Sequence, residues 1–433
     1  MKAQPPTGRG ALAAYIAVTA AYWAFMLTDG ALRMLVLLHF HTLGFSPVHL
    51  AYLFLLYEFM GIATNLSAGW VAARFGLTST LYAGLGLQIF ALAALTQLDP
   101  AWTTALSVAF VMAAQGLSGI AKDLSKMSAK SAVKLLAPAG EQGALFRWTA
   151  TLTGSKNAVK GLGFLLGSAL LALVGFEAAV IGMAAVLAAI LAAVMVWMPA
   201  GLPRGDRKAK FREVFSRSPL VNRLSAARLF LFGARDVWFV VALPVYFYTV
   251  LSDGTPEADR AAFFLVGGFM ALWIVGYGAV QALAPKLLRA REKSVGDAIR
   301  LAQLWVGALT AIPALLAVAA AAMEGGLLTA VLVAVLLVFG GVFALNSSLH
   351  SYLILALSRS ERVSMDVGFY YMSNAAGRLM GTLLSGITFQ MGGLVASLAV
   401  AAGMAALSWV FAGTLVRRAG VEAGQKGEAD AGG

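Results

Sequence analysis

The sequence predicts an all-α membrane protein with twelve transmembrane helices in two six-helix bundles and both termini in the cytoplasm. Three observations support this class: the apolar composition, the spacing of the apolar stretches and the position of the basic residues. Hydrophobic residues form 60% of the 433-residue chain and charged residues only 12%, whereas a soluble domain carries about 25% charged residues. The chain has no cysteine, which excludes disulfides, thiolate nucleophiles and thiolate metal sites.

Twelve stretches are apolar over the roughly 20 residues that a helix needs to cross a bilayer. We place them at 11–40, 48–73, 78–98, 101–122, 143–173, 176–198, 224–250, 261–285, 298–321, 327–357, 363–391 and 393–416. The first stretch is too long for a cleavable signal peptide, so we expect it to remain as an anchor.

Basic residues are concentrated in the loops on one side of the membrane. If the N-terminus is cytoplasmic, the outer loops hold only Arg260, beside Asp253, Glu257 and Asp259, and most other Lys and Arg residues lie in inner segments. Because cytoplasmic loops are enriched in Lys and Arg, this distribution predicts that both ends lie in the cytoplasm and that the number of spans is even.

The longest polar stretch between spans divides the chain into two halves. We expect an N-terminal six-helix bundle at 1–198, a basic cytoplasmic linker at 199–223, a C-terminal six-helix bundle at 224–418 and a disordered tail at 419–433.

Short internal matches support duplication of one half. Gly30-Ala31-Leu32-Arg33 in the first span resembles Gly233-Ala234-Arg235-Asp236 in the seventh. Gly163-x-x-x-Gly167 in the fifth span matches Gly377-x-x-x-Gly381 in the eleventh, and such small-residue pairs allow close helix contacts. Repeats of this kind are typical of transporters.

Charged residues within the spans indicate a functional site, because each costs about 2.5–3.5 kcal/mol at mid-bilayer on insertion scales. Basic residues outnumber acidic ones there, which suits an anionic solute. We predict substrate-binding residues at Arg33, Lys122, Lys156, Lys160, Arg235, Asn374 and Arg378, between the two bundles. Asp29, Glu58 and Asp236 would provide charge balance or proton coupling, and Lys126 and Lys130 would line a cavity entrance. Arg228 lies nearer the cytoplasm, where its long side chain can reach water.

Several of these charges have a structural alternative. Asp29 and Arg33 stand one helical turn apart and could neutralise each other, and Glu58 could pair with a basic residue of another helix. Arg235 and Asp236 are adjacent and point about 100° apart, so they cannot both face one partner, and we expect one of them to look into the central cavity. Lys130 could instead bind lipid headgroups.

Lys156, Lys160 and Arg378 form the strongest cation candidates. Lys156 and Lys160 have no acidic residue in their span, and Arg378 has none close to it in its own, so a purely structural role requires a counter-ion from another helix. Lysine supplies a point charge and arginine a planar fork that matches phosphate-like oxyanions.

Several catalytic and energy-coupling signatures are missing. The chain has no G-x-x-x-x-G-K-[ST] loop, so it cannot use ATP through such a loop, and it has no G-x-S-x-G or H-E-x-x-H. His39 and His41 have no third ligand nearby for a metal. We therefore expect no enzyme activity, no cofactor and no metal.

The loop from Gly69 to Thr78 resembles the signature loop of the major facilitator superfamily, G-x-x-x-D-[RK]-x-G-x-[RK]. Its glycines and Arg74 match, whereas Ala73 replaces the acid and Thr78 the second basic residue. Longer blocks resemble the ArsJ-type organoarsenical-efflux permeases of this superfamily. They are YWAFMLTDGALRMLVLLHFHTLGFSP (22–47), LSGIAKDLSKMSAKSAVKLL (117–136), LTGSKNAVKGLGFLLG (152–167) and SAARLFLFGARDVWFVVALPVYF (225–247).

This resemblance implies the major facilitator fold and export of 1-arseno-3-phosphoglycerate across the bacterial inner membrane, which confers arsenate resistance. It also implies a functional partner, glyceraldehyde-3-phosphate dehydrogenase, which makes the ester. We expect a monomer in the lipid bilayer with no nucleic acid partner. A transporter of another organophosphate is the first alternative, and a membrane enzyme or scaffold without transport is a remote one. Proton antiport and facilitated efflux both stay open, because the membrane potential already favours anion exit by about 2.3 kcal/mol per charge at 100 mV.

Overall fold

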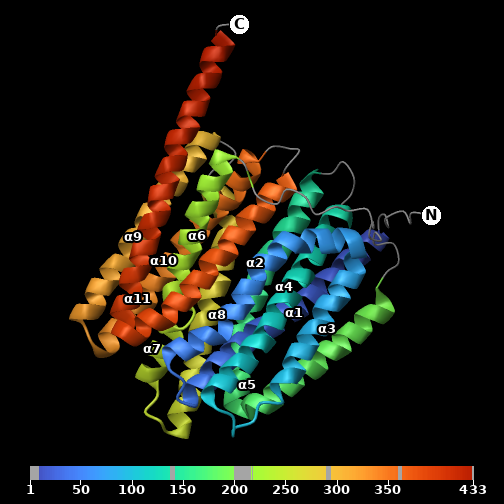
Figure 1. The fold of residues 1–433 in the computed structure, drawn as a ribbon, viewed down its shortest axis with the longest axis vertical. Coiled ribbons are helices and arrows are strands. Elements are labelled where there is room, and N and C mark those ends of the chain that lie inside the picture. The colour runs from blue at the N-terminus through green and yellow to red at the C-terminus, as the bar shows by residue number, and fades with distance from the viewer. Residues whose placement is uncertain are drawn as a thin grey trace. The chain divides into compact units, whose positions relative to one another are not determined.

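The computed structural model describes residues 9–136, 142–198, 216, 218–288, 294–358 and 363–431. Its regular elements in these ranges are helices (Figure 1). They are α1 (Arg9–Thr42), α2 (Pro47–Phe75), α3 (Leu77–Leu95), α4 (Thr104–Leu136), α5 (Gln142–Trp197), α6 (Pro219–Phe239), α7 (Ala242–Leu251), α8 (Pro256–Leu287), α9 (Val295–Ala322), α10 (Gly325–Leu357) and α11 (Val363–Ala431).

Ten segments of the described chain are long and apolar enough to cross a membrane. Two of them, within α5 and α11, contain 43 and 56 residues, whereas about 20 residues suffice for one crossing. Each is interrupted at glycine: Gly175 has φ 79°, and Gly393 has φ 61°, a region that only glycine adopts readily. Figure 1 shows that α5 and α11 each reverse direction along their length. Each of these two helices therefore contains two arms that are long enough to cross a membrane.

A shorter interruption separates α6 from α7 within one predicted span. Pro244 has no backbone N–H and its ring crowds the carbonyl four residues earlier, so the helix breaks just before it. The hydroxyl of Ser385 accepts hydrogen bonds at 3.1 Å from the backbone N–H groups of both Val241 and Ala242. The break therefore lies in the membrane-spanning part of the chain without leaving these two donors unsatisfied.

The chain forms two compact units. The first consists of Met1–Arg212 and Pro244–Gly278, and the second of Glu213–Leu243 and Ala279–Gly433. Residues 244–278 thus group with the first unit, although we expected them in the C-terminal bundle. Small residues explain this grouping, because Gly161 packs against Ala271 and Gly267 against Ser168, which brings α8 close to α5.

The two polar segments of the predicted division differ in the structure. Most of the linker at 199–223 lies outside the described residues, and its last part begins α6. The tail expected to be disordered instead continues α11 to Ala431. Its Ala, Glu, Gln and Lys residues favour helix, which explains the difference.

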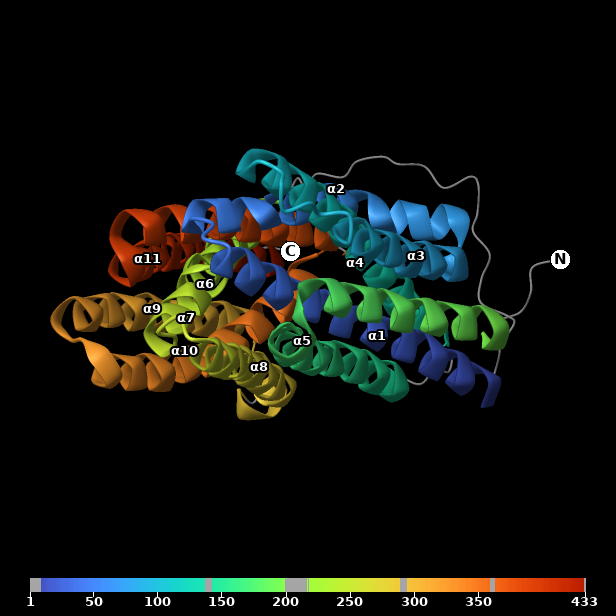
Figure 2. The same cartoon turned by 90° about the horizontal axis from the view of Figure 1, so that it is seen from below.

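Glycines bring two helices of each unit into backbone contact. In the first unit α1 lies beside α5 (Figure 2), and a Cβ added to Gly30 or Gly163 would collide with a carbonyl oxygen of the other helix. In the second unit a Cβ on Gly377 would collide with the carbonyl of Leu229 in α6. The matching sequence motifs therefore make the same kind of contact in both units.

Substitution of Gly163 tests this contact. We expect Gly163→Leu to destabilise the protein by about 3 kcal/mol or more, because the side chain would overpack a backbone contact. Thermal unfolding of the purified protein in detergent measures this as a lowered midpoint. Gly182→Leu is the matched control on the same helix, since nothing lies within 4 Å of a Cβ at Gly182. Equal midpoints for the two variants would contradict the close contact.

Candidate functional site

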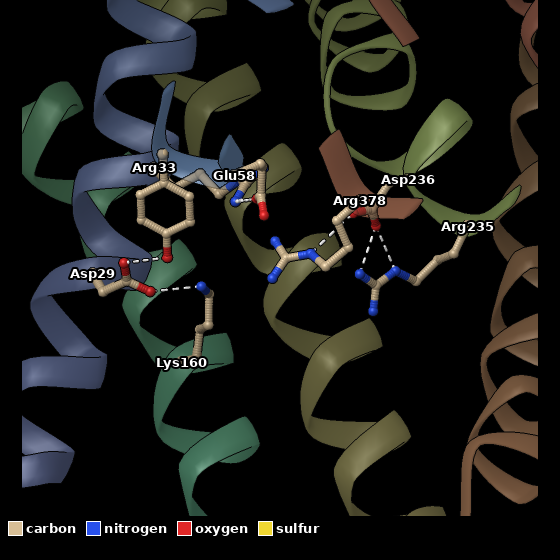
Figure 3. A network of polar contacts seen from close by, with 8 residues as sticks. Asp29, Arg33, Glu58, Lys160, Arg235, Asp236 and Arg378 are labelled. Carbon is tan, nitrogen blue, oxygen red and sulfur yellow. Dashed lines mark hydrogen bonds and ion pairs between the residues drawn. The ribbon is translucent and has the colours of Figure 1, made fainter. Parts of the chain in front are cut away.

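Asp29 is the centre of a buried polar cluster in the first unit. Its side chain accepts a hydrogen bond from the Tyr57 hydroxyl at 2.6 Å and forms an ion pair with Lys160 Nζ at 2.6 Å. Figure 3 shows Lys160 reaching Asp29 from the neighbouring helix. Gly30 follows Asp29 directly, and its contact with the Lys160 carbonyl brings the two helices together at this level. The lysine thus receives from α1 the counter-ion that its own helix does not supply.

A second ion pair joins α1 to α2. Arg33 Nη1 lies 3.1 Å from Glu58 Oε1, and Glu58 is only 1% exposed. The guanidinium also lies 5.0 Å from the centre of the Phe54 ring. Asp29 and Arg33 therefore pair with other helices rather than with each other, although they stand one turn apart. The structural alternative for Glu58, a salt bridge to another helix, is the geometry observed (Figure 3).

The basic face of α4 is only partly open. Lys122 Nζ lies 4.0 Å from the centre of the Tyr57 ring. Lys126 pairs with Asp123 and donates to Asn65 Oδ1 at 2.7 Å, while Thr64 donates to Asp123 at 2.6 Å. Lys126 therefore joins α2 to α4, and its role at a cavity entrance stays a prediction.

Lys130 and Lys156 are the other two lysines of this unit that we predicted to line the site or its entrance. The side chain of Lys130 lies outside the described residues. Lys156 is half-buried, one turn before Lys160 on α5, so the helix presents both amines on one face.

Asp236 has the corresponding place in the second unit. It is fully buried, and its two carboxylate oxygens contact Arg235 at 2.6 Å and Arg378 Nε at 3.1 Å (Figure 3). Arg378 comes from α11, which approaches α6 closely because a Cβ on Gly381 would come within 2.8 Å of the Asp236 Cβ. One carboxylate thus serves two guanidinium groups.

The adjacent residues Arg235 and Asp236 form an ion pair with each other, and the view that one of them looks into a central cavity stays a prediction. Both are buried, with Arg235 9% and Asp236 0% exposed. The guanidinium of Arg235 contacts its neighbour's carboxylate and lies 4.8 Å from the centre of the Phe232 ring. The directions of the Cα–Cβ bonds of Arg235 and Asp236 therefore do not determine where their charged groups lie.

Arg228 is a buried cation that sequence reasoning placed near water. It is 5% exposed and donates to Asn374 Oδ1 at 2.9 Å and to the Ser347 hydroxyl at 3.1 Å. Asn374, a predicted binding residue, therefore contacts Arg228 directly. The spacing of Arg228 and Arg235, two helical turns apart on α6, places both on one face and could have revealed this cation.

These charges make each unit cationic inside. In the first unit Arg33, Lys126 and Lys160 pair with Glu58, Asp123 and Asp29, and the half-buried Lys122 and Lys156 are two further cations. In the described part of the second unit, Asp236 pairs with Arg235 and the half-buried Arg378, Arg228 is a further buried cation, and Asp366 is a second buried carboxylate. Intramembrane charges of this kind mark solute or ion pathways.

An all-α multi-pass fold with a polar, charged interior defines a membrane transport protein. The sequence profile of the Major Facilitator Superfamily matches residues 14–354. The chain belongs to this superfamily and is a secondary transporter, not an enzyme.

A solved structure supports the same fold. It comes from work titled "Structural insights into substrate recognition in proton dependent oligopeptide transporters", and it aligns with a TM-score of 0.68. The alignment covers 94% of this chain and 99% of that chain at 14% sequence identity, so the likeness concerns the fold alone. The comparison with curated proteins gave no match.

Removal of the shared carboxylate tests the second cluster. We expect Asp236→Asn to lower the free energy of unfolding by about 3–5 kcal/mol, because two buried guanidinium groups lose their counter-ion. Thermal unfolding measures the loss, and Asp253→Asn, in the exposed loop before α8, is the control. An additional Arg378→Gln substitution should recover part of the loss. Unchanged stability in Asp236→Asn would show that the ion pairs contribute nothing.

Proposed function

We propose that this transporter exports an anionic phospho-organoarsenical, 1-arseno-3-phosphoglycerate, from the bacterial cytoplasm by alternating access and so confers arsenate resistance. The observation that carries the anionic substrate class is the excess of buried cations over the carboxylates that contact them in each unit. A solute with a phosphate and an arsenate-derived oxyanion needs several such cations.

Two cations of the first unit have donor capacity for a solute. Arg33 Nη2 is buried and has no hydrogen-bond partner among the described residues. Lys122 lies over the Tyr57 ring without a carboxylate at ion-pair distance in the described part of the chain. Since an unsatisfied buried donor costs about 1–3 kcal/mol, an anion that accepts from these groups would gain more than it would on the surface.

The carboxylates would act as internal substitutes for the solute. Asp29, Glu58 and Asp236 neutralise Lys160, Arg33 and the Arg235–Arg378 pair in the empty transporter. An arriving oxyanion competes with them for the cations. For antiport the carboxylate has to be charged while the solute is carried out and protonated on the return, and burial favours the protonated form because desolvation disfavours its charge. We assign proton coupling to Glu58 on this basis.

The choice of an arsenical rests on the sequence. Four long blocks resemble the organoarsenical-efflux permeases, and the absence of cysteine suits a pentavalent arsenate ester, which needs no thiolate. The dehydrogenase that forms the ester would be a functional partner. The second candidate, transport of another organophosphate, rests on the same cation excess.

Transport in inside-out vesicles tests the substrate. We expect vesicles with the protein to accumulate the arseno-ester when arsenate and the dehydrogenase are supplied, and to accumulate 3-phosphoglycerate at least about tenfold more slowly. Lys122→Gln should lower the rate by about tenfold or more, the equivalent of 1.4 kcal/mol, and it leaves no ion pair broken. Lys286→Gln, an exposed residue on α8, is the control. Equal uptake of both solutes would favour the organophosphate alternative, and no uptake would contradict both.

Proton coupling has its own measurement. In inside-out vesicles an acidic lumen should accelerate uptake, because each proton that leaves the lumen would be exchanged for solute. Glu58→Gln should retain uptake but lose its response to the pH gradient. Rates measured with and without a protonophore separate the two effects. Wild-type uptake that ignores the gradient would establish facilitated efflux instead.

A further inference from the structure

Arg228 differs from the other buried arginines of the second unit. Arg235 and Arg378 both reach Asp236, whereas no carboxylate within the described ranges lies at ion-pair distance from Arg228. Its described hydrogen-bond partners are the neutral Asn374 side chain and the hydroxyl and carbonyl oxygens of Ser347. The charge is therefore solvated by dipoles but not balanced.

The helix that faces Arg228 carries further buried polar groups. Asn346, Ser347 and His350 lie within one turn of α10 and are 0%, 0% and 1% exposed. Both amide atoms of Asn346 and both ring nitrogens of His350 have no hydrogen-bond partner in the part of the chain that is described. Ser347 bonds to Arg228, and His350 lies three residues further along the same helix. The unsatisfied groups therefore lie on the same turn of α10 as the residue that bonds the unbalanced cation.

Stacking holds the guanidinium in this position. Its carbon lies 3.9 Å from the centre of the Phe232 ring and 5.2 Å from that of Tyr370. Aromatic rings stabilise a guanidinium, and with the bonds to Asn374 and Ser347 they restrict its rotation. The N–H groups that make no protein bond are thus fixed in direction, as a rigid fork that suits an oxyanion.

The free-energy cost of an unpaired buried charge and of unsatisfied polar groups indicates which kind of ligand would suit these residues. A buried charge without a partner costs several kcal/mol, and buried polar groups without hydrogen bonds are rare in native proteins. Water could satisfy the amide and the imidazole, but it would leave the charge unbalanced. An anion with several acceptor oxygens satisfies all three side chains: the arginine N–H groups, the asparagine amide and the N–H of a neutral imidazole.

We propose that Arg228, Asn346 and His350 form an oxyanion subsite in the second unit. Its ligand is one anionic end of the solute, a phosphate, arsenate or carboxylate group. The subsite deepens the proposed function, on which it rests for the statement that its ligand is transported. The subsite would bind an oxyanion end separately from the Asp236 cluster, whose guanidinium groups already share a carboxylate.

Binding to the purified full-length protein in detergent tests the subsite, with inorganic phosphate and 3-phosphoglycerate as probes in titration calorimetry. Arg228→Gln should weaken binding of at least one probe by about tenfold or more. The control Arg223→Gln removes the same charge from the exposed start of α6 and should bind as the wild type does. A comparison of the affinities for phosphate and for 3-phosphoglycerate distinguishes a site for phosphate from one that also needs the carboxylate of the solute.

Asn346→Asp separates binding from structure. It places a carboxylate within the proposed subsite and should abolish probe binding while the unfolding midpoint stays equal or rises, because the cation would gain a counter-ion. His350→Leu should weaken binding less than Arg228→Gln does. The subsite is refuted if the wild type binds neither probe, if Arg228→Gln binds as tightly as wild type, or if Asn346→Asp keeps full affinity.

Vesicle transport distinguishes this inference from the proposed function. Probe binding that depends on Arg228 without uptake of the arseno-ester would retain the subsite and overturn the substrate. Uptake of the arseno-ester that is unchanged in Arg228→Gln and Asn346→Asp would retain the substrate and overturn the subsite.

Discussion

The backbone contact between two helices in each unit is the constraint on which the polar interior depends. Glycine at positions 30, 163, 377 and 381 lets α1 reach α5 and α6 reach α11 with no side chain between them. At that distance a carboxylate of one helix meets an amine or guanidinium of the other, as Asp29 meets Lys160 and Asp236 meets Arg378. Larger residues would separate these charges and leave each of them buried alone, which is costly in an apolar interior.

This arrangement makes the interior charged and yet stable enough to fold. Each carboxylate lies where it reduces the cost of a cation, but the cations are more numerous, so the balance is incomplete. Lys122 rests on a tyrosine ring and Arg228 on two aromatic rings and neutral dipoles. The anionic solute that we propose for this secondary transporter of the major facilitator superfamily would compete with these carboxylates for the cations.

The two units reach similar geometry by different registers. Asp29 precedes Gly30, whereas Asp236 follows Gly233 by three residues, and the partner cation is a lysine in one unit and an arginine in the other. The internal sequence matches were short for this reason. What the halves share is the close glycine contact and a carboxylate beside it, and the identities of the charged residues around it differ.

The sequence by itself determined the class of protein, the membrane-spanning stretches and most of the charged residues of the interior, because hydrophobicity, helix length and the cost of a buried charge are local properties. It also marked the glycine pairs. Only the tertiary structure decided which charges meet: Arg33 with Glu58, Lys160 with Asp29, and two arginines with Asp236. It also placed Arg228 in the interior and residues 244–278 with the first unit. These outcomes depend on contacts between residues distant in sequence, and helical periodicity gives the direction of a Cβ but not the position of a long side chain's charged end.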